Sequence, residues 1–231
     1  MVQKKKRYIL PLSLYPHYSA ATTGSNLYYL EKEASQQTKK SGIELTFLDS
    51  PSYFMHDGYI QAFVERIHAQ IQIDESLDDF YIIFSAHGLP LYFLKEGDPY
   101  PFQIAQTTSL ILEKLNRQQS WVISYQSAVG PMQWLKPSTE DIIKALARRG
   151  ITKVLVVPIA FVTDHIETLC EIDIEYRKYA EDLGIKDFRM ARAIECHPRF
   201  IGALADSVEA VLPKEKSAQA KLEPISAFQI K

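Results

Sequence analysis

Cysteine is scarce in this sequence, and its scarcity limits both redox chemistry and metal chemistry. The chain has two cysteines, Cys170 and Cys196, which lie far apart and form no motif of paired spacing. A typical iron–sulfur cluster needs four thiolates, so no such cluster can be built from this chain alone. Unpaired thiols are typical of a reducing compartment, and we therefore expect a cytoplasmic protein.

The sequence also lacks a long apolar run and an excess of charge. No stretch approaches the roughly 20 apolar residues of a membrane span, and residues 1–7 lead into no signal-peptide core. We expect no transmembrane segment, while peripheral contact with a membrane stays open. A formal net charge of -2 gives no electrostatic reason to expect nucleic acid as a partner. The basic cluster at residues 4–7 is typical of a solvated lead-in to a strand.

The most informative stretch is residues 80–90, FYIIFSAHGLP. Its five large apolar residues without a polar break indicate a strand buried on both faces of a parallel sheet. His87 follows at the carboxyl end, which is where open α/β sheets bind their ligands. A strand-end histidine can simply hydrogen-bond a neighbouring loop, but this position before Gly88 and Pro90 favours a group that accepts a proton or binds a metal. A second strand end lies at residues 158–167, and we hypothesise that the two ends face one cavity.

Strands and helices alternate along the chain, which predicts a parallel sheet with helices on both faces. Ser25 or Thr23 is expected to cap the first helix, and Ser138 to begin the fourth. The predicted strands cover residues 8–14, 43–48, 80–84, 121–126, 154–160 and 188–194. The predicted helices cover residues 25 to about 40, 51 to about 71, about 101 to 115, 138–150, 164–183 and 198 to about 212.

The opening of the chain is unusual for this pattern. Two strands before residue 50 are too few for a three-layer domain, so the first domain is expected to be incomplete. We divide the chain into a first-domain remnant, a second α/β domain, a closing helix and a mobile tail, at residues 1–50, 51–197, 198–212 and 213–231.

Three carboxylates, Glu167, Glu171 and Glu175, follow the second strand end at a spacing of four residues. On a helix this spacing forms a stripe that drifts slowly round one face. A solvated acidic start of a helix would explain the first carboxylate, because the helix dipole favours it there. It explains Glu175, two turns further on, poorly. A row of hard oxygen ligands suits a hydrated divalent cation that passes along it.

Aromatic and amide side chains gather in the strand-end loops. The turn at residues 126–134 offers amides, a thioether and an indole. Such groups can serve as loop packing or as the wall of a site for a large, flat, apolar ligand. The rings in the other strand-end loops allow the same two interpretations; they are Tyr15, Tyr18, Tyr92, Phe93 and Tyr100.

Four segments occur in a fixed order along the chain, and this combination identifies a family far more specifically than any one segment does. They are residues 84–90, 97–101, 125–135 and 158–175. Together they closely resemble the ferrochelatase family, which inserts ferrous iron into a porphyrin in haem biosynthesis, and residues 14–25 resemble that family's first-domain loop. The resemblance extends from about Tyr8 to Leu212. It implies a three-layer chelatase-like α/β fold, with two similar domains of parallel sheets flanked by helices and a porphyrin cleft between them.

The resemblance also implies roles for individual residues. His87 and Glu167 match a catalytic pair across the macrocycle, and Glu171 and Glu175 match an acidic ridge that guides metal or protons. All four are implied metal-binding residues. The implied porphyrin-binding residues are Tyr15, Tyr18, Tyr100, Gln126, Met132 and Trp134. Two features depart from the family: Cys170 stands where tyrosine is common, and the Gly-Pro-containing first strand expected upstream of the residue 14–25 loop is missing.

The expected function is therefore insertion of ferrous iron into protoporphyrin IX or coproporphyrin III, with iron and porphyrin as substrates and no prosthetic group. A non-catalytic tetrapyrrole- or metal-binding fragment of the same fold is the alternative. A related chelatase that acts on cobalt and an early corrin precursor is less favoured, because that group resembles this chain in fold rather than in residues 84–90 and 126–132. The oligomeric state stays open.

Overall fold

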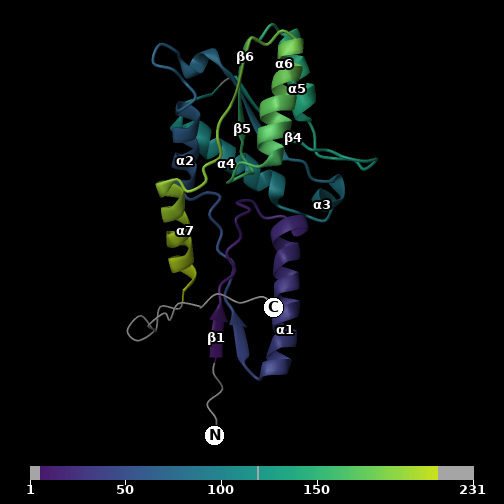
Figure 1. Ribbon diagram of the computed structural model, residues 1–231, viewed down its shortest axis with the longest axis vertical. Coiled ribbons are helices and arrows are strands. Elements are labelled where there is room, and N and C mark those ends of the chain that lie inside the picture. The colour runs from purple at the N-terminus through teal and green to yellow at the C-terminus, as the bar shows by residue number, and fades with distance from the viewer. Residues whose placement is uncertain (1–5, 119, 213–231) are drawn as a thin grey trace.

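The protein contains two parallel sheets, and the computed structural model describes residues 6–118 and 120–212. Strands β1 (Lys6–Ile9) and β2 (Glu44–Phe47) pair in a two-stranded sheet beside helix α1 (Ser25–Ser41), at the bottom of Figure 1. The second sheet has four strands in the order β4-β3-β5-β6. Their bounds are Tyr81–His87 for β3, Trp121–Gln126 for β4, Lys153–Pro158 for β5 and Asp187–Met190 for β6.

Helices cover both faces of the four-stranded sheet, as the alternation of elements predicts. One face packs under α2 (Asp57–His68) and α4 (Tyr100–Lys114), with α7 (Pro198–Val211) against α2. The other face packs under α5 (Thr139–Arg148) and α6 (Arg177–Asp182). The uninterrupted apolar run of β3 serves both layers, since Ile82 and Phe84 point into the first core and Ile83 into the second.

Several element boundaries differ from the prediction, and two of these differences have a local reason. The first strand ends at Ile9, two residues before Pro11, which has no N–H for a ladder. Helix α2 begins at Asp57 rather than near residue 51, because the His56 ring accepts a hydrogen bond from Gly58 N and caps the helix there. The last strand stops at Met190 rather than at residue 194.

The start of the first helix is also different. A short π-helical segment, η1 (Ala20–Gly24), precedes α1, and Ser19 caps it by accepting a hydrogen bond from Ala21 N. Ser25 and Thr23 therefore do not act as the N-cap. The predicted Ser138 cap of α5 is confirmed, since Ser138 Oγ accepts from Asp141 N. Helix α3 (Leu91–Lys95) and the short η2 (Leu77–Asp79) were not predicted.

The predicted helix at residues 164–183 is confirmed in part. It begins at Glu167 as a π-helix, η3 (Glu167–Tyr176), and continues as α6. An i→i+5 turn is wider than an α-turn, so residues four apart stay on one side of the helix. The boundary at residue 50 stays a prediction, and the expected mobile tail at 213–231 lies outside the described residues. Within the part of the chain that is described, no helix has the length and apolar character to cross a membrane.

The loop that precedes η1 is hydrogen-bonded to α4 through a buried histidine, His17. Thr107 Oγ1 donates to Phe54 O over 2.8 Å, so its oxygen must accept the 2.9 Å hydrogen bond from His17 Nε2. Next to it, Tyr18 N donates to Gln103 Oε1 over 2.7 Å. His17 is 1% exposed, and this burial lowers its pKa from 6.5 to about 3. The imidazole is therefore neutral in the folded protein.

This buried imidazole predicts a specific loss of stability in acid. Between pH 6.5 and about 3 the unfolded chain binds a proton at His17 that the folded chain does not bind, so stability falls as pH falls. We expect the free energy of unfolding to drop by about 2 kcal/mol more between pH 7 and pH 5 in the wild type than in His17→Gln, at about 1.4 kcal/mol per pH unit. Urea unfolding at both pH values measures it. The exposed His68→Gln is the control, and equal pH dependence in wild type and His17→Gln would contradict the assignment.

Candidate functional site

A cavity of about 240 Å³ opens at the carboxyl ends of the central strands. One wall is the loop before α1, and the other comes from the end of β3, the start of α4 and the segment after β5. The residues that line it are Tyr15, Pro16, His17, Ser19, Thr22, His87, Gly88, Leu89, Tyr100, Ala160, Phe161, His165 and Glu167.

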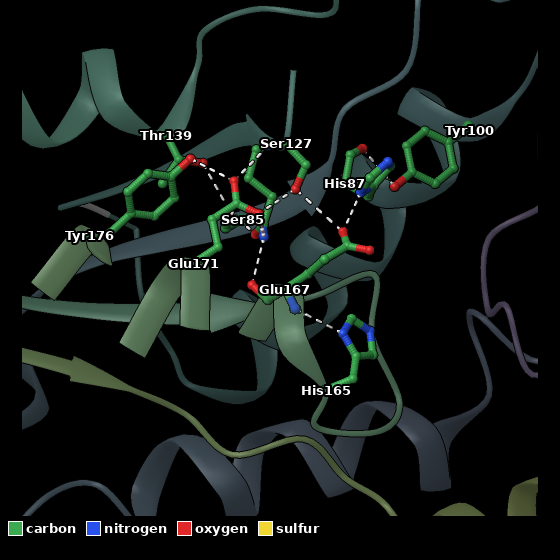
Figure 2. A network of polar contacts seen from close by, with 10 residues as sticks. Ser85, His87, Tyr100, Ser127, Thr139, His165, Glu167, Glu171 and Tyr176 are labelled. Atoms are coloured by element: carbon green, nitrogen blue, oxygen red, sulfur yellow. Dashed lines mark hydrogen bonds and ion pairs between the residues drawn. The ribbon is translucent and has the colours of Figure 1, made fainter. Parts of the chain in front are cut away.

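His87 and Glu167 meet at this cavity although 80 residues separate them. Strands β3 and β5 are direct neighbours, with Ser85 opposite Pro158, so the segments that follow them emerge side by side. His87 Nδ1 lies 2.6 Å from Glu167 Oε2 (Figure 2). The side chains are 43% and 35% exposed, which leaves both within reach of a ligand. A carboxylate here accepts the Nδ1 proton, so the lone pair is on His87 Nε2.

Ser127 connects Glu167 to the next carboxylate of the stripe. Its hydroxyl contacts Glu167 Oε2 at 3.3 Å and also contacts Glu171 Oε2, while its backbone N donates to Glu171 Oε1 over 2.9 Å. Tyr176 OH donates to the same Glu171 oxygen over 2.9 Å, and the pKa of Tyr176 is raised by burial and by that carboxylate. Ser127 has a φ of 60°, a left-handed conformation that is uncommon for serine.

A chain of buried hydroxyls fixes the orientation of Gln126, the last residue of β4. Ser85 Oγ donates to Gln126 Oε1 over 2.7 Å and therefore accepts from Thr139 Oγ1 at 2.9 Å. The amide nitrogen of Gln126 is thus turned toward η3, where it donates to Glu167 O at 3.1 Å. Gln126 is 1% exposed, so it positions the carboxylate-bearing helix and does not form the cavity wall.

The other residues from the sequence-based site fall in two groups. Tyr15 and Tyr100 line the cavity, and Tyr100 OH donates to His87 O over 3.0 Å. Burial is the main reason that the pKa of Tyr100 is raised, and the phenol therefore keeps its proton. The remaining four lie outside this cavity: Tyr18, Met132, Trp134 and Glu175.

Local contacts explain the positions of these outer residues. Trp134 Nε1 donates to Val129 O within its own loop, and Met132 in that loop is exposed. Glu175 accepts from the Cys170 thiol at 3.6 Å, on a part of η3 that is not joined to the Ser127 contacts. Glu175 and Glu171 also contribute to raising the pKa of Cys170, after the larger effect of desolvation.

Sequence reasoning missed His165 and Phe161, which both line the cavity. His165 lies below Glu167 in Figure 2, and its Nδ1 accepts from Glu167 N over 3.1 Å. Phe161 packs edge-on against both His165 and His87. The position of His165, two residues before a helix start, is the signal that identifies it as a capping acceptor. Among the described residues, no cluster of three or more His, Cys, Asp or Glu side chains is arranged to hold a metal.

Comparison with known proteins places these features in a family. The family model described as Ferrochelatase matches residues 1–212. A ferrochelatase of Nostoc punctiforme is 43% identical over 223 residues, which cover 95% of this chain and 57% of that protein. A ferrochelatase of Trichodesmium erythraeum is 46% identical over 207 residues, which cover 89% and 52%. The chain thus spans about half the length of the curated relatives it matches.

Solved structures support the fold. SirB from Bacillus subtilis with Fe3+ superposes with a TM-score of 0.62 at 13% identity, covering 91% of this chain and 73% of that one. The sirohydrochlorin chelatase SirB from Bacillus subtilis subspecies spizizenii in complex with cobalt gives 0.55 at 12% identity, covering 90% and 70%. At such identities the likeness concerns the fold alone. Because the ferrochelatase model matches most of its length, the chain belongs to the ferrochelatase family.

Proposed function

We propose that this chain carries the metal-insertion site of a ferrochelatase, which places ferrous iron in a porphyrin during haem biosynthesis. The observation that carries the proposal is the 2.6 Å contact between His87 Nδ1 and Glu167 Oε2 at the wall of a cavity. Membership of the ferrochelatase family supports it. Iron is a substrate in this proposal, and the reaction needs no resident prosthetic group.

The proposed chemistry begins with the porphyrin protons. A free porphyrin holds two pyrrole N–H protons in a nearly planar ring, so a metal can enter only when both leave and the ring bends. The Nε2 lone pair of His87 accepts one pyrrole proton, and the Glu167 carboxylate stabilises the imidazolium that forms. That proton leaves to solvent by way of the η3 carboxylates, and Nε2 is then free to accept the second pyrrole proton. A cavity that holds the ring in a bent geometry would lower the barrier, because that geometry is nearer the transition state.

The carboxylates on η3 supply a route for protons or metal ions to and from the His87–Glu167 pair. Ser127 joins Glu167 to Glu171, so a proton or a hydrated cation moves between neighbouring oxygen ligands. In the proposed site Glu175 extends this acidic ridge toward solvent, with its carboxylate exposed on the next turn of η3.

A second role for His87 fits the same geometry. Neutral imidazole is a good ligand for ferrous iron, and the tautomer fixed by Glu167 leaves Nε2 as the ligating atom. His87 then binds the iron before the ring does, and Glu167 takes the pyrrole proton.

A binding function without catalysis is the second candidate, and the size of the cavity favours it. Pockets for ligands of drug size measure about 300–1,000 Å³, whereas this cavity measures about 240 Å³. A tetrapyrrole would therefore lie partly outside the described cavity walls. In that candidate the chain binds a tetrapyrrole or a metal but does not bend the ring.

Protoporphyrin IX and coproporphyrin III are both retained as substrates. We propose a cytoplasmic location, with peripheral membrane contact and oligomeric state to be measured. The proposed porphyrin contacts include Tyr15 and Tyr100 in the cavity, and Tyr18, Met132 and Trp134 outside it.

Replacing His87 separates the two candidate functions. We expect His87→Ala to lower iron insertion by about 10²–10⁴-fold, the usual contribution of a general acid or base, with the far-UV circular dichroism unchanged. Anaerobic assays of ferrous iron and zinc insertion, followed by porphyrin absorbance, measure the effect. His68→Ala, at the exposed end of α2, is the control. Unchanged turnover in His87→Ala removes His87 from the mechanism, and porphyrin binding without insertion by the wild type leaves only the binding function.

The carboxylate stripe predicts an effect on the metal more than on the porphyrin. We expect Glu171→Gln to raise the apparent KM for ferrous iron about tenfold, or roughly 1.4 kcal/mol, because Glu171 contacts Ser127 beside the His87–Glu167 pair. Glu175→Gln should raise it less, since Glu175 is outside those contacts.

Steady-state kinetics with varied iron, together with porphyrin fluorescence titration, make this measurement. Glu181→Gln removes an exposed charge from α6 and is the matched control. Equal weakening of porphyrin binding and of iron use in Glu171→Gln would count against a metal route.

A further inference from the structure

The two walls of the cavity come from segments that are distant in sequence. The loop wall contributes Tyr15 and His17, and the opposite wall contributes His87 and Tyr100. The gap between these walls decides which ligand fits. The contacts that fix the distance between the walls therefore help to determine which ligand the site accepts.

One carboxylate, that of Asp98, contacts both walls. Its Oδ2 accepts from Ser19 Oγ over 2.9 Å and from Ala20 N over 2.8 Å, at the end of the loop wall. Its Oδ1 accepts from Tyr100 N over 3.0 Å, at the start of α4. Asp98 is 8% exposed, and a buried carboxylate is tolerated only when its oxygens are hydrogen-bonded in this way.

The contacts continue from Asp98 to the proposed catalytic group. Tyr100, whose backbone N is held by Asp98, donates its phenol proton to the carbonyl of His87 over 3.0 Å. On the other wall, Ser19 is 1% exposed and caps η1, so it transmits the position of Asp98 to the loop. A shift of this carboxylate thus moves the loop wall and His87 relative to each other.

We propose that Asp98 is a positioning residue that sets the width of the cavity by holding both walls with one carboxylate. The part of this inference that concerns porphyrin rests on the proposed function. Asp98 is not among the residues that line the cavity; it acts through Ser19 and Tyr100.

Asp98→Asn is the sharpest test, because it keeps the shape of the side chain. A carboxamide has one acceptor oxygen, so in either orientation its NH2 faces a backbone N–H, that of Ala20 or that of Tyr100. One wall is released in each case. We expect the KM for protoporphyrin IX to rise about tenfold, the factor that corresponds to 1.4 kcal/mol, while kcat with ferrous iron stays within about twofold. Ser19→Ala, which removes one of the three bonds, should give a smaller rise.

A general loss of stability must be distinguished from a change of width. Asp187→Asn breaks a contact to Arg189 on the far side of the sheet and serves as the destabilised control. It should lower the unfolding temperature without changing the KM for porphyrin. If Asp98→Asn and Asp187→Asn change KM to the same extent at equal unfolding temperature, Asp98 is a structural residue and the proposal is overturned.

Hydrogen–deuterium exchange tests the same contact without any porphyrin. In Asp98→Asn, amide exchange should accelerate at Ala20 or Tyr100 and stay unchanged at Ile83 in the core of β3. Unchanged exchange at both amides overturns the proposal even if the wild type binds porphyrin. Faster exchange in the variant, with no porphyrin bound by the wild type, keeps Asp98 as the positioning residue of the cavity and rejects the proposed substrate.

Discussion

The hydrogen bond between His87 and Glu167 is the contact on which the site depends. It joins the last residue of β3 to the helix that follows β5, so the parallel pairing of β3 with β5 is what brings the two side chains together. A register change of one residue would turn His87 to the opposite face of the sheet. The buried run of β3, packed in both cores, prevents such a shift.

The buried polar residues next to the site hold its side chains in position and are not proposed to take part in the reaction. Ser124, Thr139, Ser85 and Gln126 form a chain of hydroxyls and an amide, all of them buried, between the sheet and η3. Each hydroxyl can donate once, and the order of donors and acceptors is therefore determined by the chain itself. Such a satisfied buried network makes a region rigid. The acidic helix is thus placed by β4 and not by packing alone.

Sequence reasoning could predict the elements whose signals are local. Residues 121–126 form β4 as expected, and Ser138 caps α5 because its hydroxyl reaches Asp141 N within one turn. The predicted start of α2 near residue 51 was wrong, because His56 caps the helix and it begins at Asp57. The π-helical form of η3 was not predicted, because a spacing of four residues is compatible with either helix.

The site shows the same difference between residues with a local sequence signal and residues whose roles depend on tertiary contacts. His87 and Glu167 could be found because one ends a buried apolar strand and the other begins the helix after the next such strand in the sheet. Asp98 and His17 could not, because their roles depend on contacts 79 and 90 residues away in the sequence. Tyr18, Met132 and Trp134 are residue types that suit a site for a flat apolar ligand, but they lie outside the cavity. Residue type indicates a ligand class, whereas tertiary contacts decide which rings reach it.

At Ser127 the requirement for stability conflicts with the requirement for contact between the carboxylates, because its backbone is left-handed. Glycine adopts this conformation with less strain, so a laboratory selection for heat resistance alone would favour it there. The same exchange would delete the one hydroxyl that contacts Glu167 and Glu171 together. Directed evolution of this chain toward a higher unfolding temperature would thus remove the contact that links Glu167 to Glu171. A library that is meant to keep the site intact should therefore hold Ser127 constant.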